Sequence, residues 1–227
     1  MLTSIIIPTL NEESHIQRAL QSLLHFSDIE VIISDGGSSD RTCDEVKPFL
    51  LKYPFIQLVH AKRGRAPQMN AGAKTALGDW FLFLHADTII PERSWTYFLG
   101  ATRQNAIRAG SFLFSVDDQK FRFRIMSKMV NLRTRLFKLP YGDQALFVRK
   151  DVFETIGAFR DDYPLMEDVE FVTRLRKAKG FKILQTPIIT SSRRFQKDGY
   201  LKRIAFNMLI TILYHGGVHP KNLVKYY

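Results

Sequence analysis

Polar side chains that could bind a ligand follow each of four short apolar runs in the first half of the chain. Thr9-Leu10-Asn11-Glu12 and Asp35-Gly36-Gly37-Ser38 follow the first two runs, and Lys62-Arg63-Gly64-Arg65 and His85-Ala86-Asp87 follow the next two. If the runs are parallel strands, these segments share one edge of a sheet, which is where the ligand crevice of such sheets lies. The pattern therefore predicts a binding site built from four strand ends.

Asp35 ends its apolar run and is followed by two glycines and two serines. A carboxylate at a strand end can hydrogen-bond a ribose or the edge of a uracil, while Gly36 and Gly37 let the backbone approach the ligand closely. The alternative is a tight turn in which Ser39 or Asp40 caps the next helix.

Arg63 and Arg65 stand just ahead of a predicted helix that carries Asn70. Two guanidinium groups at a helix N-terminus suit a diphosphate, because their formal charge and the helix dipole have the same sign. The alternative is a solvated basic loop on a protein that is basic throughout.

Asp87 follows the apolar run Phe81 to Leu84. A carboxylate there would be desolvated unless its charge is compensated, and a divalent cation that chelates a diphosphate is one such compensation. His85 could be a second ligand of that cation or a hydrogen-bond donor to the first. The alternative has Asp87 bonded to amides in a turn before Pro91, which suits the first residue of a helix.

Three acids, Glu167, Asp168 and Glu170, gather at the start of another predicted helix. The helix dipole favours acids at this position whatever their function, so the cluster alone has a structural explanation. A chemical role for one of them depends on the other segments.

The elements that position these residues are read from the apolar pattern. Short runs rich in Ile, Val and Phe alternate in the first half with longer stretches of helical period, as in strands joined by crossover helices. The predicted fold class is α/β, with a mostly parallel sheet flanked by helices. Strands are expected over residues 3–8, 30–34, 56–60, 80–84, 109–116, 144–149 and 181–189, and helices from residue 14 and over residues 41–53, 67–77, 121–137 and 167–179.

Composition limits the function classes. With 227 residues, 45% of them hydrophobic, the chain can bury one substantial core, and we expect a single domain. A formal charge of +11 points to a negative partner: nucleic acid, an anionic membrane or a phosphorylated small molecule. The single cysteine, Cys43, excludes an internal disulfide and is compatible with a reducing compartment. We expect no signal peptide, and no apolar stretch approaches the roughly 20 residues of a membrane span.

Together and in this order, the segments resemble the inverting family 2 glycosyltransferases, whose GT-A fold is a Rossmann-like sheet that binds a nucleotide-sugar. The resemblance covers roughly residues 3–189. Its matching segments are Pro8-Thr9-Leu10-Asn11-Glu12, Asp35-Gly36-Gly37-Ser38-Ser39-Asp40, the loop from Arg63 to Gly72, Asp87, Gly142-Asp143-Gln144 and Glu167-Asp168. The run Leu84-His85-Ala86-Asp87-Thr88 is similar to one in the small single-domain bacterial members. Residues 1–227 would then form one glycosyltransferase domain, with a nucleotide-binding half over about 1–108, an acceptor half over about 109–190 and a basic tail over 191–227.

The resemblance implies a role for each matching residue. Asp168 would be the catalytic base, and Asp87 would be the last carboxylate of the family's Asp-x-Asp motif and would bind Mg²⁺ or Mn²⁺. A nucleotide-diphosphate sugar, with a UDP-sugar favoured, would be held by Pro8, Thr9, Asn11, Glu12, Asp35, Gly36, Arg63, Arg65, Asn70 and Asp87. Asp143, Gln144 and Glu167 would lie on the acceptor side. The sugar would move with inversion in one in-line displacement, through a transition state that resembles an oxocarbenium ion.

Two departures from the family pattern qualify these roles. His85 stands where the family has the first carboxylate of Asp-x-Asp. The Gln-x-x-Arg-Trp signature of polymerising members is missing, and Arg193-Arg194-Phe195 is only a loose echo of it. The enzyme is therefore expected to add one sugar per encounter.

The basic surplus is concentrated in two segments. Residues 119–139 hold seven Lys or Arg and no acid, with apolar residues at helical spacing, which is typical of a helix at a membrane interface. A core-packed helix with a solvated basic face is the alternative. The tail from Arg193 to Tyr227 also has seven basic residues, with Asp198 as its one acid. A lipid or lipid-linked acceptor at an anionic membrane surface would account for both segments, in a cytoplasmic protein that is peripheral on the inner face of the membrane.

Two other classes compete with this interpretation. A nucleic-acid-binding module would leave Asp35, Asp87 and Asp168 unexplained, and Phe121-Arg122-Phe123-Arg124 is its only candidate surface, so no nucleic acid is expected. A nucleotidyltransferase on a similar sheet would favour a glycine-rich loop after the first strand, and residues 9–12 contain no glycine.

Overall fold

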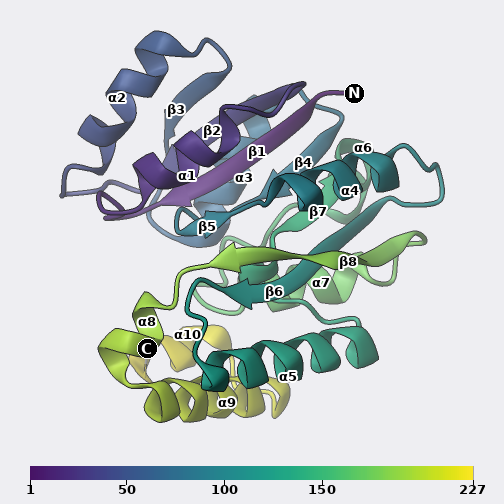
Figure 1. Cartoon of the computed structure of the whole chain (residues 1–227). Coiled ribbons are helices and arrows are strands. Elements are labelled where there is room, and N and C mark those ends of the chain that lie inside the picture. The colour runs from purple at the N-terminus through teal and green to yellow at the C-terminus, as the bar shows by residue number, and fades with distance from the viewer. Residues whose placement is uncertain (227) are drawn as a thin grey trace.

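An eight-stranded sheet runs through the centre of the protein (Figure 1). The computed structural model describes the backbone of residues 1–226, and their side chains except those of residues 194, 197, 198, 201 and 226. The strands are β1 (Thr3–Thr9), β2 (Ile29–Asp35), β3 (Ile56–His60), β4 (Trp80–Phe83), β5 (Thr88–Ile89), β6 (Ala109–Val116), β7 (Leu146–Arg149) and β8 (Phe181–Thr190). Their order in space is β3-β2-β1-β4-β7-β6-β8-β5.

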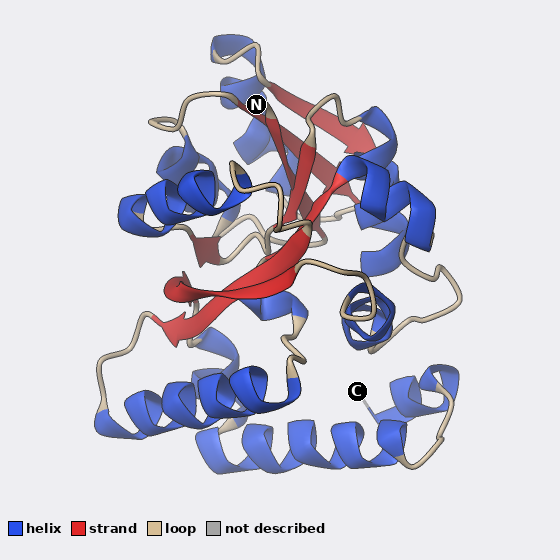
Figure 2. Ribbon diagram, turned by 90° about the vertical axis from the view of Figure 1, so that its right-hand side faces the viewer, coloured by secondary structure: helices blue, strands red, loops and turns tan. Residues whose placement is uncertain are grey.

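Helices cover the sheet and extend beyond it (Figures 1 and 2). They are α1 (Ile16–Leu23), α2 (Thr42–Lys52), α3 (Arg65–Thr75), α4 (Glu92–Thr102), α5 (Phe121–Phe137), α6 (Lys150–Ile156), α7 (Glu167–Leu175), α8 (Arg193–Asp198), α9 (Tyr200–His215) and α10 (Pro220–Leu223). Short 3-10 turns form η1 (Gly142–Gln144) and η2 (Val224–Tyr226).

The first half of the sheet is parallel. β1 pairs with β2 and β4, and β2 pairs with β3, all in parallel register. Both faces are covered: Ile5 packs in a cluster with residues of α1 and α2, whereas Ile6 packs with α3 on the other side. This two-sided burial explains why these strands read as unbroken apolar runs. Thr9 is the register partner of Asp35, and Asp35 that of His60, so the carboxyl ends of these strands meet at one edge.

The second half joins the first through an antiparallel pair. β7 is antiparallel to both β4 and β6, β6 is parallel to β8, and β5 is antiparallel to β8. Thr88 in β5 thereby faces Thr190 at the end of β8. This pairing brings the segment after β4, with Asp87, beside the start of the C-terminal helices.

Helices α5 and α9 form a layer beside the sheet. In both views α5 and α9 run side by side below the sheet (Figures 1 and 2). Phe123 and Met126 of α5 pack with Phe114 and Val116 of β6 in a separate apolar cluster. No helix in the described part of the chain is both long enough and apolar enough to cross a membrane.

Most expected elements are present, with corrections at their ends. β3, β6 and α5 have the predicted bounds, and four of the seven strand pairings are parallel. Several predictions were wrong in detail, and the helix expected over residues 67–77 is α3, Arg65–Thr75. The strand expected from Gln144 starts at Leu146 because Gln144 ends the turn η1, the helix expected to reach Lys179 ends at Leu175, and Pro91 precedes α4 rather than opening it. The expected basic tail ends at Tyr227, which lies outside the described residues.

Candidate functional site

A cavity of about 490 Å³ lies at the carboxyl ends of β1 and β4. Its lining includes Pro8 and Thr9 at the end of β1 and Glu12 just after it, together with Arg63 and Asp87, and we call it the strand-end cavity. These residues, all expected to bind a donor, thus line one space. The sequence prediction that strand ends converge is confirmed for these segments.

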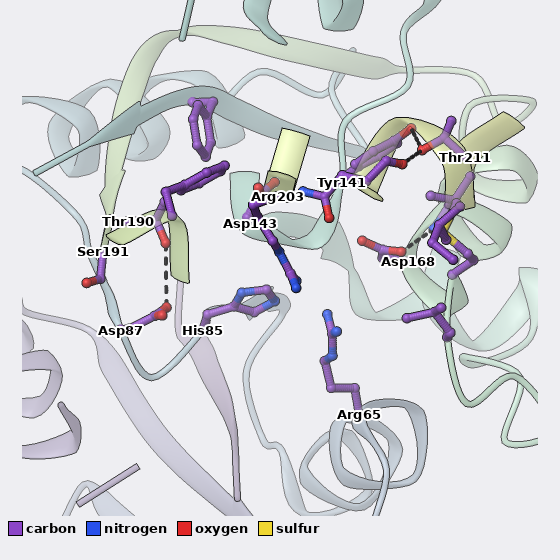
Figure 3. A pocket seen from close by; sticks show the side chains of 17 residues that line it. Arg65, His85, Asp87, Tyr141, Asp143, Asp168, Thr190, Ser191, Arg203 and Thr211 are labelled. Atoms are coloured by element: carbon purple, nitrogen blue, oxygen red, sulfur yellow. Dashed lines mark hydrogen bonds between the residues drawn. The ribbon is translucent and has the colours of Figure 1, made fainter. Parts of the chain in front are cut away.

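A second cavity, of about 170 Å³, adjoins it and is named here the Asp168 cavity. Asp143 of η1 and Asp168 of α7 line it on one side, and Asn207 and Thr211 line it from α9. Four residues line both cavities: Arg65, His85, Asp87 and Leu165. In Figure 3 the side chains of His85, Arg65 and Asp168 point toward the same space.

Asp35 lies under the strand-end cavity rather than in its lining. Its Oδ1 accepts hydrogen bonds from Oγ1 of Thr9 (3.3 Å) and Oγ of Ser38 (2.5 Å), and its Oδ2 accepts from the backbone N–H groups of Gly37 and Ser38, both at 2.9 Å. Burial alone would raise the pKa of Asp35, but these hydrogen bonds outweigh it and hold the pKa below its ordinary value. The carboxylate therefore fixes the loop beside β1.

Asn11 and Gly36 serve the same loop. Asn11 has a positive φ of 56°, and its Oδ1 accepts from the backbone N–H of Ser39 at 2.9 Å. A Cβ at Gly36 would lie 2.8 Å from Cδ of Gln68, whose amide donates to the carbonyls of Thr9 and Ser34. Neither Asn11 nor Gly36 lines either of these two cavities. The turn considered as the alternative is also present, because Asp40 accepts from the backbone N–H of Thr42 at the start of α2.

The arginine loop leads into α3, but the helix begins two residues earlier than expected, so Arg63 precedes it and Arg65 does not. Gly64 has a φ of 128°, in the region that favours glycine, and Arg65 is the first residue of the helix. Nε of Arg65 lies 3.4 Å from Oε1 of the buried Glu167, while the exposed Arg63 lines the strand-end cavity. Asn70 points elsewhere: it bonds the backbone of Phe159 through both amide atoms and Oδ1 of Asp161.

Asp87 is held by residues from the end of β8. Its Oδ2 lies 3.2 Å from Nη2 of Arg193, and its Oδ1 accepts a long hydrogen bond of 3.5 Å from Thr190 (Figure 3). The same Nη2 donates to both oxygens of Glu12, at 2.8 and 2.7 Å. Within the described residues no three His, Cys, Asp or Glu side chains are grouped so that they could hold a metal ion.

Asp168 sits in the first turn of α7, which follows Met166 in the left-handed conformation. Its Oδ2 accepts from the backbone N–H of Gly142 at 2.6 Å, and its Oδ1 from that of Val169 at 2.8 Å. A Cβ at Gly142 would lie 3.1 Å from both Oδ2 of Asp168 and Nε2 of His85. Asp168 and His85 therefore approach the same point.

Two further acids lie beside Asp168: Glu167 is buried, and the half-buried Asp143 lines the same cavity. Burial raises the pKa of Asp143 to about 6, with Arg133 opposing the shift and Asp168 adding to it. Burial likewise raises the pKa of Glu167 to about 7, where Arg65 opposes and Asp168 adds. Oδ1 of Asp143 and both carboxylate oxygens of Glu167 are buried without a hydrogen bond within the described structure. Burying a polar group without a hydrogen bond costs free energy, and buried acids with shifted pKa values are typical of functional sites.

Gln144, expected on the acceptor side, lines neither cavity. Its Oε1 accepts from Thr134 of α5 at 2.9 Å, and its amide donates to the carbonyl of Phe112 in β6 at 3.0 Å. It is fully buried and joins three elements around η1. In this position Gln144 supports the turn that presents Asp143 and Gly142.

Several residues that complete the site were missed by reasoning from the sequence. Arg193 and Thr190 contact Asp87, His15 contacts Arg193, and Arg203 and Tyr141 line the Asp168 cavity. Tyr141 adjoins the Gly142-Asp143-Gln144 segment and could have been found from it. Arg193 had a signal too, as the first residue of the loose echo of the polymerising signature.

Comparison with known proteins gives consistent results. A family model described as glycosyl transferase family 2 matches residues 4–160. A PGL/p-HBAD biosynthesis glycosyltransferase of Mycobacterium bovis is 31% identical over 179 residues, which are 75% of this chain and 68% of that protein. The probable glycosyltransferase YdaM of Bacillus subtilis is 27% identical over 194 residues, 76% of this chain. This chain spans about half of YdaM, since the match covers 46% of that protein.

A third relative is named for its action on a lipid-linked sugar. It is the dolichyl N-acetyl-alpha-D-glucosaminyl phosphate 3-beta-D-2,3-diacetamido-2,3-dideoxy-beta-D-glucuronosyltransferase of Methanococcus voltae. It is 28% identical over 218 residues, 83% of this chain and 65% of that protein.

Solved structures share the fold. S. aureus TarS, residues 1–349, superposes with a TM-score of 0.69 at 20% identity, over 85% of this chain and 61% of that one, and it has also been solved with UDP-GlcNAc. A mannosyltransferase of Pyrobaculum calidifontis, in complex with GDP-Man and Mn²⁺, superposes with a TM-score of 0.61 at 20% identity, over 84% of this chain and 56% of that one. The expected α/β fold of GT-A type is confirmed.

Proposed function

The chain belongs to glycosyl transferase family 2, and from that premise we propose that it transfers one sugar from a nucleotide-diphosphate donor to an acceptor hydroxyl, with inversion. One observation carries the proposal. The strand-end cavity and the Asp168 cavity share Arg65, His85 and Asp87, so a donor in the first would end where an acceptor in the second begins.

The donor occupies the strand-end cavity in this proposal. Its volume of about 490 Å³ is in the range of small-molecule sites. Arg63 and Arg65 bind the diphosphate through charge and hydrogen bonds, and Pro8, Thr9 and Glu12 contact the nucleoside. Asp35, Asn11 and Gly36 act through the loop that they hold beside Thr9, and Asn70 acts through Asp161, which lines the cavity.

The nucleotide base of the donor is the next point that we propose. A UDP-sugar is favoured, in line with the UDP-GlcNAc that is bound in one TarS structure. The GDP-Man bound by the Pyrobaculum calidifontis enzyme makes a GDP-sugar the first competitor to test.

Asp168 acts as the general base. The hydrogen bonds from Gly142 and Val169 fix the orientation of its carboxylate at the edge of the Asp168 cavity. An acceptor hydroxyl there gives its proton to Asp168 as its oxygen attacks the anomeric carbon, while the bond from that carbon to the diphosphate breaks. Asp143 and Glu167 shape the acceptor side through their charge, and Glu167 also holds Arg65.

A divalent cation, Mg²⁺ or Mn²⁺, fits Asp87. The carboxylate already lies 3.2 Å from a cationic nitrogen of Arg193, so the site stabilises positive charge, and His85 lines the same cavities. When bound, the cation would neutralise charge on the departing diphosphate. Asp87 alone supplies few ligands, so the donor's phosphate oxygens must provide most of the others.

A lipid or lipid-linked acceptor at an anionic membrane surface is the acceptor we propose, with the protein peripheral on the cytoplasmic face. Its support is a stripe on the outer face of α5, named here the apolar stripe: Phe121, Ile125, Met129, Leu132 and Leu136. Phe121 is 77% exposed, and Met129 and Leu136 are each 67% exposed. The inner face of α5 packs on β6, so the helix combines the two alternatives considered from sequence.

Exposed apolar side chains on α9 also favour a membrane surface. Met208, Leu209 and Ile212 are exposed on α9, whereas Asn207, Ile210 and Thr211 of the same helix line the Asp168 cavity. Basic residues of α5 flank the apolar stripe, and the chain carries a formal charge of +11. A surface of this kind suits an anionic bilayer.

The experiment that tests the function is a panel of UDP- and GDP-sugars, each with and without Mn²⁺. We expect one donor to raise the thermal unfolding midpoint and to be hydrolysed slowly without an acceptor. An Asp168→Asn variant should keep the stabilisation and lose the hydrolysis. A panel in which no nucleotide-sugar stabilises the protein would overturn the proposal.

A further inference from the structure

Arg193 joins two carboxylates that come from different strand ends. Its Nη2 donates to Oε1 and Oε2 of Glu12, at 2.8 and 2.7 Å, and lies 3.2 Å from Oδ2 of Asp87. Glu12 follows β1 and Asp87 follows β4, whereas Arg193 opens α8 directly after β8. One guanidinium nitrogen thus stands between the two acids in the strand-end cavity.

The position of Arg193 is fixed on several sides. Nη1 of Arg193 bonds Nδ1 of His15 at 2.9 Å, and because arginine only donates, this ring nitrogen is an unprotonated acceptor. The adjoining backbone is held as well. The backbone N–H of Ser191 donates to the carbonyl of Asp87 at 3.1 Å, and that of Ser192 donates to Oδ1 of Asp117 at 2.9 Å. Arg193 is therefore held in one place beside Glu12 and Asp87 of the strand-end cavity.

A divalent cation at Asp87 would compete with this guanidinium. A cation on Oδ2 of Asp87 would lie close to Nη2 of Arg193, because Mg²⁺ binds carboxylate oxygens at about 2.0–2.1 Å and Nη2 is already 3.2 Å from that oxygen. The two positive charges would also repel each other at that distance. A diphosphate would change the balance, because its oxygens offer Arg193 another partner and give the cation further ligands.

We propose that Arg193 is the built-in counter-ion of Asp87 and Glu12 in the donor-free protein, and that it keeps a divalent cation off Asp87 until a diphosphate is bound. This role rests on the proposed donor site and adds an order of binding to it. Donor and cation bind together, and neither binds tightly without the other. Arg193 also begins the segment that lines the Asp168 cavity through Phe195 and Arg203. Release of Arg193 from Asp87 therefore couples donor binding to the wall of the acceptor site.

The test measures Mn²⁺ binding to the full chain without any sugar, from the spectrum of free Mn²⁺ in electron paramagnetic resonance. The wild-type protein should bind Mn²⁺ weakly, and UDP or GDP should tighten the binding. Arg193→Gln should bind Mn²⁺ about tenfold more tightly than wild type in the absence of nucleotide, because a neighbouring positive charge is removed. Nucleotide should then tighten it less than in wild type.

Matched variants separate this effect from a change in net charge. Arg103→Gln removes the same charge from an exposed residue after α4 and should leave Mn²⁺ affinity unchanged. Asp87→Asn added to Arg193→Gln should abolish the gain. If Arg193→Gln does not fold, Arg193→Lys is tested instead. An ammonium group cannot bridge both acids as the guanidinium does, so the Mn²⁺ affinity of this variant should be intermediate.

Mn²⁺ affinity equal to wild type in the Arg193 variants would overturn the proposal. An equal nucleotide effect in wild type and Arg193→Gln would overturn the coupling. Failure of any nucleotide to bind wild type would instead refute the proposed donor site, and the nucleotide-free comparison would still decide the role of Arg193.

Discussion

The backbone N–H of Gly142 donates a 2.6 Å hydrogen bond to Oδ2 of Asp168. This bond ties the turn η1, just before β7, to the first turn of α7, and it sets the direction of the carboxylate that we assign as the base. Because Gly142 has no side chain, Nε2 of His85 can also come close to it. The orientation of Asp168 thus depends on a residue that offers only its main chain.

Replacing Asp168 by asparagine should abolish transfer while donor affinity stays nearly unchanged. Asparagine keeps the shape but cannot accept a proton, and loss of a general base typically costs about 10² to 10⁴-fold in rate. The check is kcat together with nucleotide binding by calorimetry. Glu170→Gln is the matched control, since Glu170 bonds Arg174 and lines neither cavity, and it should cost far less. A near-parental rate in Asp168→Asn would mean that the base is another acid.

Gly142→Ala should slow transfer by about tenfold or more with little change in the unfolding midpoint. The new Cβ would lie 3.1 Å from both Asp168 Oδ2 and His85 Nε2, so one of these side chains must shift away from its place in the cavity. Gly100→Ala is the control, because a Cβ there meets no atom within 4 Å, and its rate should equal that of wild type. Equal rates in both variants would contradict the arrangement of Asp168 and His85.

Glu167 should make the protein less stable as pH rises from 4.5 to about 7. Burial raises its pKa from 4.5 to about 7, so between these values the folded state binds more protons than the unfolded state, and stability falls; above about 7 this group contributes no further change. Glu167→Gln should remove that part of the slope, which at about 1.4 kcal/mol per pKa unit is on the order of 10 °C in the unfolding midpoint across the window. Glu154→Gln, at an exposed site on α6, should keep the full slope. A parental slope in Glu167→Gln would speak against the assignment.

Chelation of divalent cations should weaken donor binding through Asp87. We expect EDTA to lower donor affinity by about tenfold or more in wild type, because the cation links Asp87 to the diphosphate. Asp87→Asn should show the weakened affinity without EDTA and no further loss with it. Asp162→Asn, at an exposed acid outside both cavities, should behave as wild type in calorimetry. Full donor affinity in EDTA is the result that would remove the cation from the mechanism.

The apolar stripe should carry binding to anionic vesicles. Serine at both Leu132 and Leu136 should reduce co-sedimentation with such vesicles several-fold and leave the unfolding midpoint unchanged, because these side chains are 57% and 67% exposed. Leu77→Ser, at a residue that is 76% exposed but distant from α5 in the fold, is the control. Salt should weaken the binding, since surface charges are screened over about 8 Å at physiological ionic strength. Salt-resistant binding to neutral vesicles would refute an electrostatic surface.

Local patterns in the sequence are enough to predict those helices and strands whose own residues show a clear period. β3, β6 and α5 have their predicted bounds because each is a continuous run with one clear period, ended by polar or turn residues. The strand ends were also predictable, since parallel pairing brings carboxyl ends to one edge, and Thr9, Arg63 and Asp87 do line one cavity there. Asp168 lines the adjoining cavity, from a helix start that the acid cluster marked.

The rest depends on contacts between distant parts of the chain. β5 has only two residues and exists because Thr88 meets Thr190, 102 positions later, so no local period could mark it. Arg193 reaches Glu12 across 181 positions, and nothing near either residue indicates the pair. Asn70 and Gln144 have polar side chains of the kind expected at a ligand, but tertiary packing gives their hydrogen bonds to the protein itself.

The pairing of β5 with β8 has a consequence for synthesis on the ribosome. Thr88 emerges 102 residues ahead of Thr190. At roughly 5–20 residues per second, the nascent chain waits about 5–20 s for that partner. β1 to β4 can pair during this interval, because all four are complete by Phe83. Asp87 cannot take its final position until the end of β8 and Arg193 have been translated, so a polypeptide released before that point would carry most of the sheet and an unfinished site.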